Sequence, residues 1–69
     1  MKISARNRLR GKIVEVTNGK TTAHVRIDTG SAIVTAAITN EAVEELGLKV
    51  GQEAYAVIKA SDVMVAVDD

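Results

Sequence analysis

Hydrophobic and polar positions alternate along most of the chain, which is the pattern of half-buried β-strands. The first such segment is Asn7–Thr17. Its apolar phase shifts between Ile13 and Val14, so that either a β-bulge lies there or both faces of the strand are buried. Asn18 and Gly19 follow, and because both residue types tolerate positive φ they predict a type I′ hairpin turn.

Two further strands are predicted in the first half of the chain. In Thr21–Asp28 the apolar residues occupy every second position, and His24 falls on the opposite, polar face, where we expect it to be solvated. A turn at Thr29–Ser31 leads into a third strand, Ala32–Thr39, which consists mostly of small and β-branched residues.

A two-turn helix is predicted from Asn40 to Gly47. Thr39 or Asn40 can cap its N-terminus, and Gly47 suits the left-handed position that ends a helix. Val43 and Leu46 lie one turn apart and form an apolar pair that we expect to plug one end of a barrel.

The remaining chain predicts two more strands, Glu53–Lys59 and Val63–Val67, joined by a turn at Ala60–Asp62. Three strands, a helix and two strands follow one another along the chain. This order favours an all-β fold: a small, closed, five-stranded OB-like barrel with one short helix between strands three and four. The spacing alone also permits an SH3-like barrel.

The composition limits what such a chain can do. Sixty-nine residues form one domain, 1–69, and a core of this size is marginal without disulfides, a metal or self-association. There is no Cys and one His, while 46% of the residues are hydrophobic, so self-association is the expected support. A net charge of zero argues against nucleic-acid binding. No apolar run approaches the length of a membrane span, and no signal-peptide pattern is present, so we expect no membrane partner and a cytoplasmic location.

A polar segment before the first strand carries candidate chemistry. Ser4 has a hydroxyl, Arg6 has a charged guanidinium and Asn7 has an amide. All three groups can donate hydrogen bonds to anionic oxygens. Taken alone, the segment is most simply a solvated chain end.

A second segment near the other end has the same character. Lys59 and Ser61 flank Ala60 at a predicted tight turn, where backbone N–H groups can converge on an anion. Alone it is an ordinary surface turn. Taken together, the two segments offer Arg6, Lys59, the hydroxyls of Ser4 and Ser61 and backbone amides, which act only as donors where they contact an anion. Such a set suits a fully deprotonated tetrahedral dianion such as molybdate, tungstate or sulfate. Monohydrogen phosphate would need an acceptor as well.

These segments, residues 3–7 and 57–64, resemble the two signatures of the molybdopterin-binding-protein (Mop) or molbindin family, and residues 43–48 and 50–51 resemble its helix and the turn that follows. The resemblance covers essentially the whole chain. It implies an OB-like barrel in a homohexamer built as a trimer of dimers. It also implies that molybdate or tungstate binds at subunit interfaces for storage, with no other cofactor and no metal ligated directly by protein.

The resemblance also implies roles for individual residues. Ser4 and Arg6 would come from one subunit and Lys59, Ala60 and Ser61 from its partner, with Ala5 and Asn7 belonging to the first motif. A second class of anion site in the family makes weaker candidates of four further residues: Asn18, Gly19, Ile38 and Thr39.

Three functions other than storage can be compared with the sequence. A regulatory or interaction module could signal molybdate occupancy to a protein partner. A nucleic-acid-binding OB domain would use stacked aromatic residues, and Tyr55 is the only aromatic residue. Catalysis is not expected, because the sequence offers no nucleophile–base pair and no metal cluster.

Overall fold

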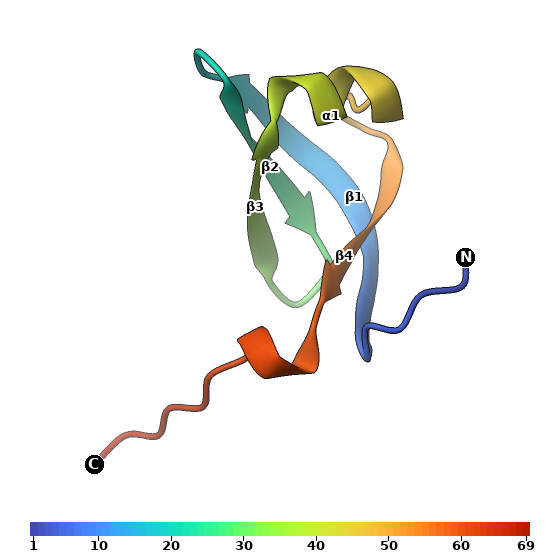
Figure 1. Cartoon of the computed structure of the whole chain (residues 1–69). Coiled ribbons are helices and arrows are strands. Elements are labelled where there is room, and N and C mark those ends of the chain that lie inside the picture. The colour runs from blue at the N-terminus through green and yellow to red at the C-terminus, as the bar shows by residue number, and fades with distance from the viewer.

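The computed structural model describes residues 1–69 and is mostly β, with one short α-helix (Figure 1). The strands form one antiparallel sheet in the order β3-β2-β1-β4, which curls into a half-barrel (Figure 1). In chain order the elements are β1 (Asn7–Asn18), β2 (Thr22–Asp28), β3 (Ile33–Thr39), α1 (Asn40–Leu46), β4 (Glu53–Ile58) and the 3-10 turn η1 (Ala60–Asp62).

The long strand β1 contains a bulge, which is one of the two alternatives that its sequence left open. Ile13 lies opposite Ile27 and Glu15 lies opposite Arg26, so Val14 is the extra residue on β1. The bulge lets Ile13 and, beyond it, Val16 pack on the same core, and bulges of this kind bend a strand. The shift in apolar phase was therefore a correct signal.

Strand β1 pairs with a different neighbour along each half of its length. Residues 7–12 pair with β4, and residues 12–18 pair with β2. Lys12 is the one residue in both registers, opposite Asp28 on one side and Glu53 on the other. The two ladders that β1 forms are therefore offset along its length.

Gly11 lies where the two ladders meet, and it allows the chains to approach closely. A Cβ built at this position would lie 2.4 Å from the backbone oxygen of Asp28 and 2.9 Å from Ile27 Cγ2. Any side chain there would push the end of β2 away from β1.

The hairpin between β1 and β2 differs from the prediction. Neither Asn18 nor Gly19 has positive φ, so the type I′ turn at these residues is wrong. Asn18 still pairs with Ala23, and the Gly19 N–H donates to the Thr22 oxygen at 2.9 Å. The two residues of the tight turn are therefore Lys20 and Thr21, and neither has a positive φ.

The core lies on the inner face of the curled sheet. Strand β2 buries alternate residues as predicted, and His24 is exposed on the outer face. Six buried residues form one cluster, and each of them is aliphatic: Ile13, Ala23, Val25, Ile27, Val43 and Ala56.

Helix α1 begins and ends as its sequence indicates. Thr39, not Asn40, is the N-cap, and its Oγ1 accepts a hydrogen bond from the Ala42 N–H at 3.0 Å. Gly47 ends the helix at φ 61° and ψ 40°. Val43 reaches the core, but Leu46 is largely exposed, so the helix covers one end of the half-barrel with a single buried residue. No helix in the structure is long and apolar enough to cross a membrane.

The predicted fifth strand and the closed barrel are wrong for the single chain. Residues 63–67 are extended but pair with no other strand, and Val65 and Val67 are 90% and 86% exposed. The chain leaves the body after η1 and runs outward as an arm (Figure 1). Without a fifth strand β3 and β4 are both edges, and an apolar groove of about 680 Å³ is lined by residues of both, including Val34, Ile38 and Ile58.

Replacing Ile13 by Ala tests the core. Ile13 is 1% exposed, and large-to-small changes at such positions cost about 2–5 kcal/mol in the free energy of unfolding. The neighbouring bulge residue Val14 is 41% exposed, so Val14→Ala is the matched control and should cost less than about 1 kcal/mol. Urea unfolding of both variants measures the difference; equal losses would contradict this placement of the bulge.

The Arg10–Glu53 pair predicts a pH effect. Arg10 Nη2 donates to both carboxylate oxygens of Glu53, at 2.8 and 3.0 Å, and this hydrogen bond, with the attraction between the charges, lowers the pKa of Glu53 below its ordinary value of 4.5. Because the pKa of Glu53 is lower in the folded state, its ionisation stabilises the fold at pH values above the ordinary pKa of 4.5. That contribution is lost as the pH falls through the pKa of the folded state.

Both side chains are exposed, so we expect a small effect. Glu53→Gln should reduce the unfolding free energy slightly at pH 7, and the difference from the unchanged protein should shrink as the medium is acidified below pH 4.5. Glu45→Gln, which breaks no ion pair, is the control. A Glu53→Gln effect that persists unchanged at low pH would contradict the assignment.

Candidate functional site

The two polar segments singled out in the sequence meet at one end of the sheet. Asn7, the first residue of β1, lies opposite Ile58, the last residue of β4. Because the strands are antiparallel, residues 4–6 enter the sheet beside the point where residues 59–61 leave it. Within one chain the pairing of β1 and β4 therefore brings the first and second motifs side by side.

Asn7 joins these segments directly. Its Nδ2 donates to the backbone oxygen of Ile58 at 3.2 Å, and the residue is half-buried. Ala5 is also buried, at 8% exposure, so its side chain packs inward. In this chain Asn7 and Ala5 hold the first motif against the sheet.

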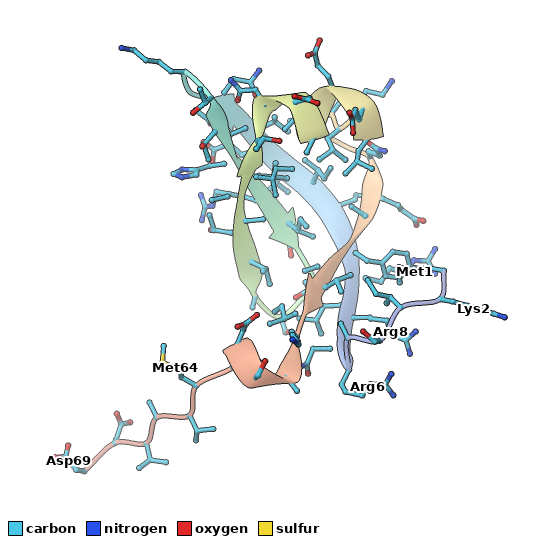
Figure 2. The ribbon with its side chains drawn as sticks, in the orientation of Figure 1. Met1, Lys2, Arg6, Arg8, Met64 and Asp69 are labelled. Atoms are coloured by element: carbon cyan, nitrogen blue, oxygen red, sulfur yellow. The ribbon has the colours of Figure 1, made fainter.

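The donors of the first motif point to solvent. The Arg6 Nε donates to the Ser4 backbone oxygen at 2.9 Å, which fixes the bend of the segment and leaves the two terminal nitrogens of Arg6 without a partner. Arg6 and Arg8 extend from the lower end of β1 (Figure 2). Neither forms an ion pair, whereas Arg10 and Arg26 are paired with glutamates. Arg8 is thus a further free cation near this end, which the sequence analysis did not select.

The second motif is a single 3-10 turn. The Asp62 N–H donates to the Lys59 oxygen at 2.9 Å, and the Val63 N–H donates to the Ala60 oxygen at 3.3 Å. The N–H groups of Ala60 and Ser61 have no acceptor in the chain, and the Lys59 ammonium and the Ser61 hydroxyl are also unpartnered. The turn thus offers two backbone and two side-chain donors.

This arrangement has the chemistry of an anion site but is open in the single chain. Ser4, Arg6 and residues 59–61 are all exposed, and the one groove of the molecule is apolar and does not include them. Water and dissolved salt screen the charges of an exposed site, and water competes with the ligand for the donors. A second surface is therefore needed to enclose an anion here. The one carboxylate in the turn, Asp62, makes no ion pair.

The four candidates for a second site lie at the other end of the sheet, beside α1. Asn40 connects them: its Nδ2 donates to the Gly19 oxygen at 2.8 Å, and its backbone N–H donates to the Thr21 oxygen at 2.8 Å. The Gly19 N–H and the Thr39 hydroxyl already have partners, and Ile38 packs against the core. The structure therefore brings the hairpin turn and the end of β3 together, while the role of Asn18, Gly19, Ile38 and Thr39 in anion binding stays a prediction.

Sequence reasoning missed Asn40 as the residue that ties the hairpin to the helix. Its Oδ1 is buried without a hydrogen-bond partner. No group of three or more His, Asp or Glu side chains is placed to hold a metal ion.

The chain has relatives whose sequences match nearly its full length. The TOBE domain family matches residues 3–65. A probable molybdenum-pterin-binding protein of Haemophilus influenzae is 52% identical over 69 residues, which are 99% of this chain and 100% of that protein.

Two solved structures share the fold. A molybdate-binding protein from Sporomusa ovata is 34% identical with a TM-score of 0.92, covering 97% of this chain and 100% of the other. The cytoplasmic molybdate-binding protein ModG, solved with molybdate bound, is 43% identical with a TM-score of 0.87; the match covers 93% of this chain and 46% of ModG. The resemblance drawn from the two motifs is confirmed: the chain belongs to the TOBE domain family, among the molybdenum-pterin-binding (Mop) proteins.

Proposed function

We propose that this protein binds molybdate, and also tungstate, between copies of itself and holds the anion in reserve in the cytoplasm without catalysing a reaction. The observation that carries the proposal is the meeting of two donor-rich segments, residues 4–6 and 59–61, at one end of the sheet. The names of the relatives, which include molybdate-binding proteins of the same fold, supply the identity of the anion.

The donor set explains why a fully deprotonated dianion suits this end of the sheet. Arg6 and Lys59 supply charge, and the Ala60 and Ser61 N–H groups with the hydroxyls of Ser4 and Ser61 supply neutral donors. Hydrogen bonds to charged groups contribute about 1.5–3 kcal/mol each, so several together offset the cost of removing the anion from water. Protonated phosphate would meet donors and, apart from Asp62, no carboxylate acceptor in the turn.

The exposure of the site supports its placement at an interface. We propose the assembly that the family resemblance implies, a homohexamer built as a trimer of dimers, with Ser4 and Arg6 of one copy facing Lys59–Ser61 of another. Burial between copies would exclude water and strengthen each charged contact.

Calorimetry with four anions tests the ligand. Molybdate and tungstate should bind, sulfate should bind more weakly because it is smaller, and phosphate should bind least. No binding of molybdate, or equal binding of sulfate, would refute the proposed function. Native mass spectrometry in molybdate then gives the number of copies and of anions in each assembly.

Removing the Arg6 charge should weaken binding without unfolding the protein. Loss of one charge-assisted contact predicts an affinity about 10- to 150-fold lower for Arg6→Gln. Stability should change little, because Arg6 is exposed and makes a single local hydrogen bond. Arg26→Gln removes an equal charge on β2, outside both motifs, and is the control. Normal molybdate binding by Arg6→Gln would remove this residue from the site.

Mixing two inactive variants tests whether the site is shared. If Arg6 and Lys59 act from different copies, a mixed dimer of Arg6→Gln and Lys59→Gln contains one site with both residues intact, so calorimetry of the refolded mixture should recover binding. If both residues act within one chain, every site in the mixture lacks one of them and no binding returns. The second result would overturn the shared site while leaving molybdate as the ligand.

A further inference from the structure

The outer face of β1 carries a row of three cations, at every second position: Arg8, Arg10 and Lys12. Arg10 donates to both carboxylate oxygens of Glu53. Lys12 lies opposite Asp28 on β2 and opposite Glu53 on β4. Carboxylates therefore accompany the upper two cations of the row, whereas Arg8, at the lower end, makes no ion pair.

Arg8 lies close to a second unpaired cation, Lys59. In the ladder between β1 and β4, Arg8 is opposite Val57. Lys59 is extended, with φ −63° and ψ 137°, so it continues the alternation of β4 and falls on the same face as Val57. That position is diagonal to Arg8, and diagonal neighbours on one face of a sheet are about 7–8 Å apart. Neither cation makes an ion pair, so two like charges face solvent near one another.

A third unpaired cation, Arg6, precedes the strand. Figure 2 shows Arg6 and Arg8 extending to the same side of the lower end of β1. Asp62 is the one carboxylate in either motif, so the three cations outnumber the acidic residues at this end of the sheet. Like charges this close repel one another, and a bound anion would relieve the repulsion. The end of the sheet therefore carries a positive potential.

Arg8 differs from Arg6 in how its guanidinium is held. Arg6 is fixed by the hydrogen bond from its Nε to the Ser4 oxygen, and it lies within the first motif. Arg8 lies within the strand, two residues further on, and no ion pair fixes its side chain. Holding a long side chain in one rotamer costs conformational entropy. A mobile Arg8 therefore acts on an anion at the end of the sheet through its charge and not through a fixed hydrogen bond.

A charge that acts at a distance discriminates between anions in a particular way. The energy between two charges is proportional to their product, so a remote cation attracts a dianion twice as strongly as a monoanion of the same shape. Hydrogen-bond donors in contact with the anion respond instead to distance and angle, and thus to the size of the anion. Selection by charge and selection by size can therefore reside in different residues.

We propose that Arg8 is a specificity-determining residue of the anion site, which favours tetrahedral dianions over tetrahedral monoanions through its charge and without touching the anion. This inference rests on the proposed function. It assigns selection by charge to the outer face of β1 and leaves selection by size to the donors of residues 4–6 and 59–61.

Calorimetry of Arg8→Gln with molybdate at two salt concentrations tests the action at a distance. The Debye length is about 30 Å in 0.01 M salt and about 3 Å in 1 M salt. We expect Arg8→Gln to bind molybdate about 2- to 5-fold more weakly at the lower concentration, which is the effect of one charge about 10 Å from a dianion in water. At the higher concentration the two proteins should bind equally. A larger loss that persists in 1 M salt would show direct contact and overturn the proposal, as would no loss in 0.01 M salt.

Perrhenate, a tetrahedral monoanion, tests selection by charge. Its affinity is measured in 0.01 M salt by displacement of molybdate from both proteins. Arg8→Gln should weaken perrhenate binding by about the square root of the factor found for molybdate, because the charge of the anion is halved. Equal factors for the two anions would refute selection by charge. Perrhenate that displaces molybdate from neither protein would show that the selection does not depend on Arg8.

Two further variants separate charge from geometry and from position. Arg8→Lys keeps the charge, so it should bind both anions as the unchanged protein does; a loss in Arg8→Lys would indicate a contact specific to the guanidinium. Lys49→Gln removes an equal charge from an exposed, unpaired residue after α1, at the other end of the sheet, and should leave both affinities unchanged. A loss in Lys49→Gln equal to that in Arg8→Gln would mean that total charge, and not Arg8, attracts the anion.

Thermal unfolding without any anion ligand measures the repulsion directly. Arg8→Gln should raise the melting temperature in 0.01 M salt, because it removes one of three like charges, and the gain should vanish in 1 M salt. No gain, beside normal molybdate binding, would place Arg8 outside the field of the site and overturn the inference. Absence of molybdate binding by the unchanged protein would instead refute the proposed function, and a salt-dependent gain would then still show the positive end of the sheet.

Discussion

Closure of the sheet is the constraint on which the rest of this structure depends. Four strands curl around a core of six aliphatic residues, but the two edges do not meet, and the interior between them stays open. A buried Val stabilises a fold by about 1.5–3 kcal/mol, whereas Val63 after the turn η1 is half exposed and Val65 and Val67 are almost fully exposed. Domains are stable by about 5–15 kcal/mol in total, so this uncovered surface is a large share of what a 69-residue chain has available.

The same constraint relates the apolar and the polar parts of the molecule. Strand β4 forms one wall of the groove and ends at the turn that carries Lys59, Ala60 and Ser61. The first motif reaches that turn through the pairing of Asn7 with Ile58. The net charge of zero does not reveal how the charges are distributed. Arg10 and Arg26 form ion pairs with glutamates, whereas three other cations at one end of the sheet form none: Arg6, Arg8 and Lys59. Local pairing, not total charge, determines where an anion is attracted.

The features that sequence predicted well are those set by nearby residues. The alternation in β2 and the Gly47 cap each depend on a few neighbouring positions, and both were confirmed. The shift in apolar phase at Ile13 and Val14 is equally local, and the structure decides for a bulge there over burial of both faces. The fifth strand was wrong because residues 63–67 have the right pattern, but a strand also needs a partner, and none lies within the chain. At the hairpin, Asn18 and Gly19 are typical residues of a type I′ turn. The ladder nevertheless continues to the hydrogen bond between Gly19 and Thr22, so the turn lies at residues 20–21. Residue types suggested the anion site. The meeting of its two segments within one chain comes from the long-range pairing of Asn7 with Ile58, which the sequence did not predict, because the motif resemblance placed the two segments in different subunits.

The offset of the two ladders along β1 has a consequence for motion. Because Lys12 alone belongs to both registers, the lower half of β1 with β4 can separate while the upper half stays paired with β2. Ile13, Val25 and Ile27 lie on the upper side of that division and keep the rest of the sheet folded. The end of the molecule that carries the polar motifs is held by the β1–β4 ladder and by Ala56 in the core, and we expect its amide hydrogens to exchange more readily than those of β2, which is paired on both sides.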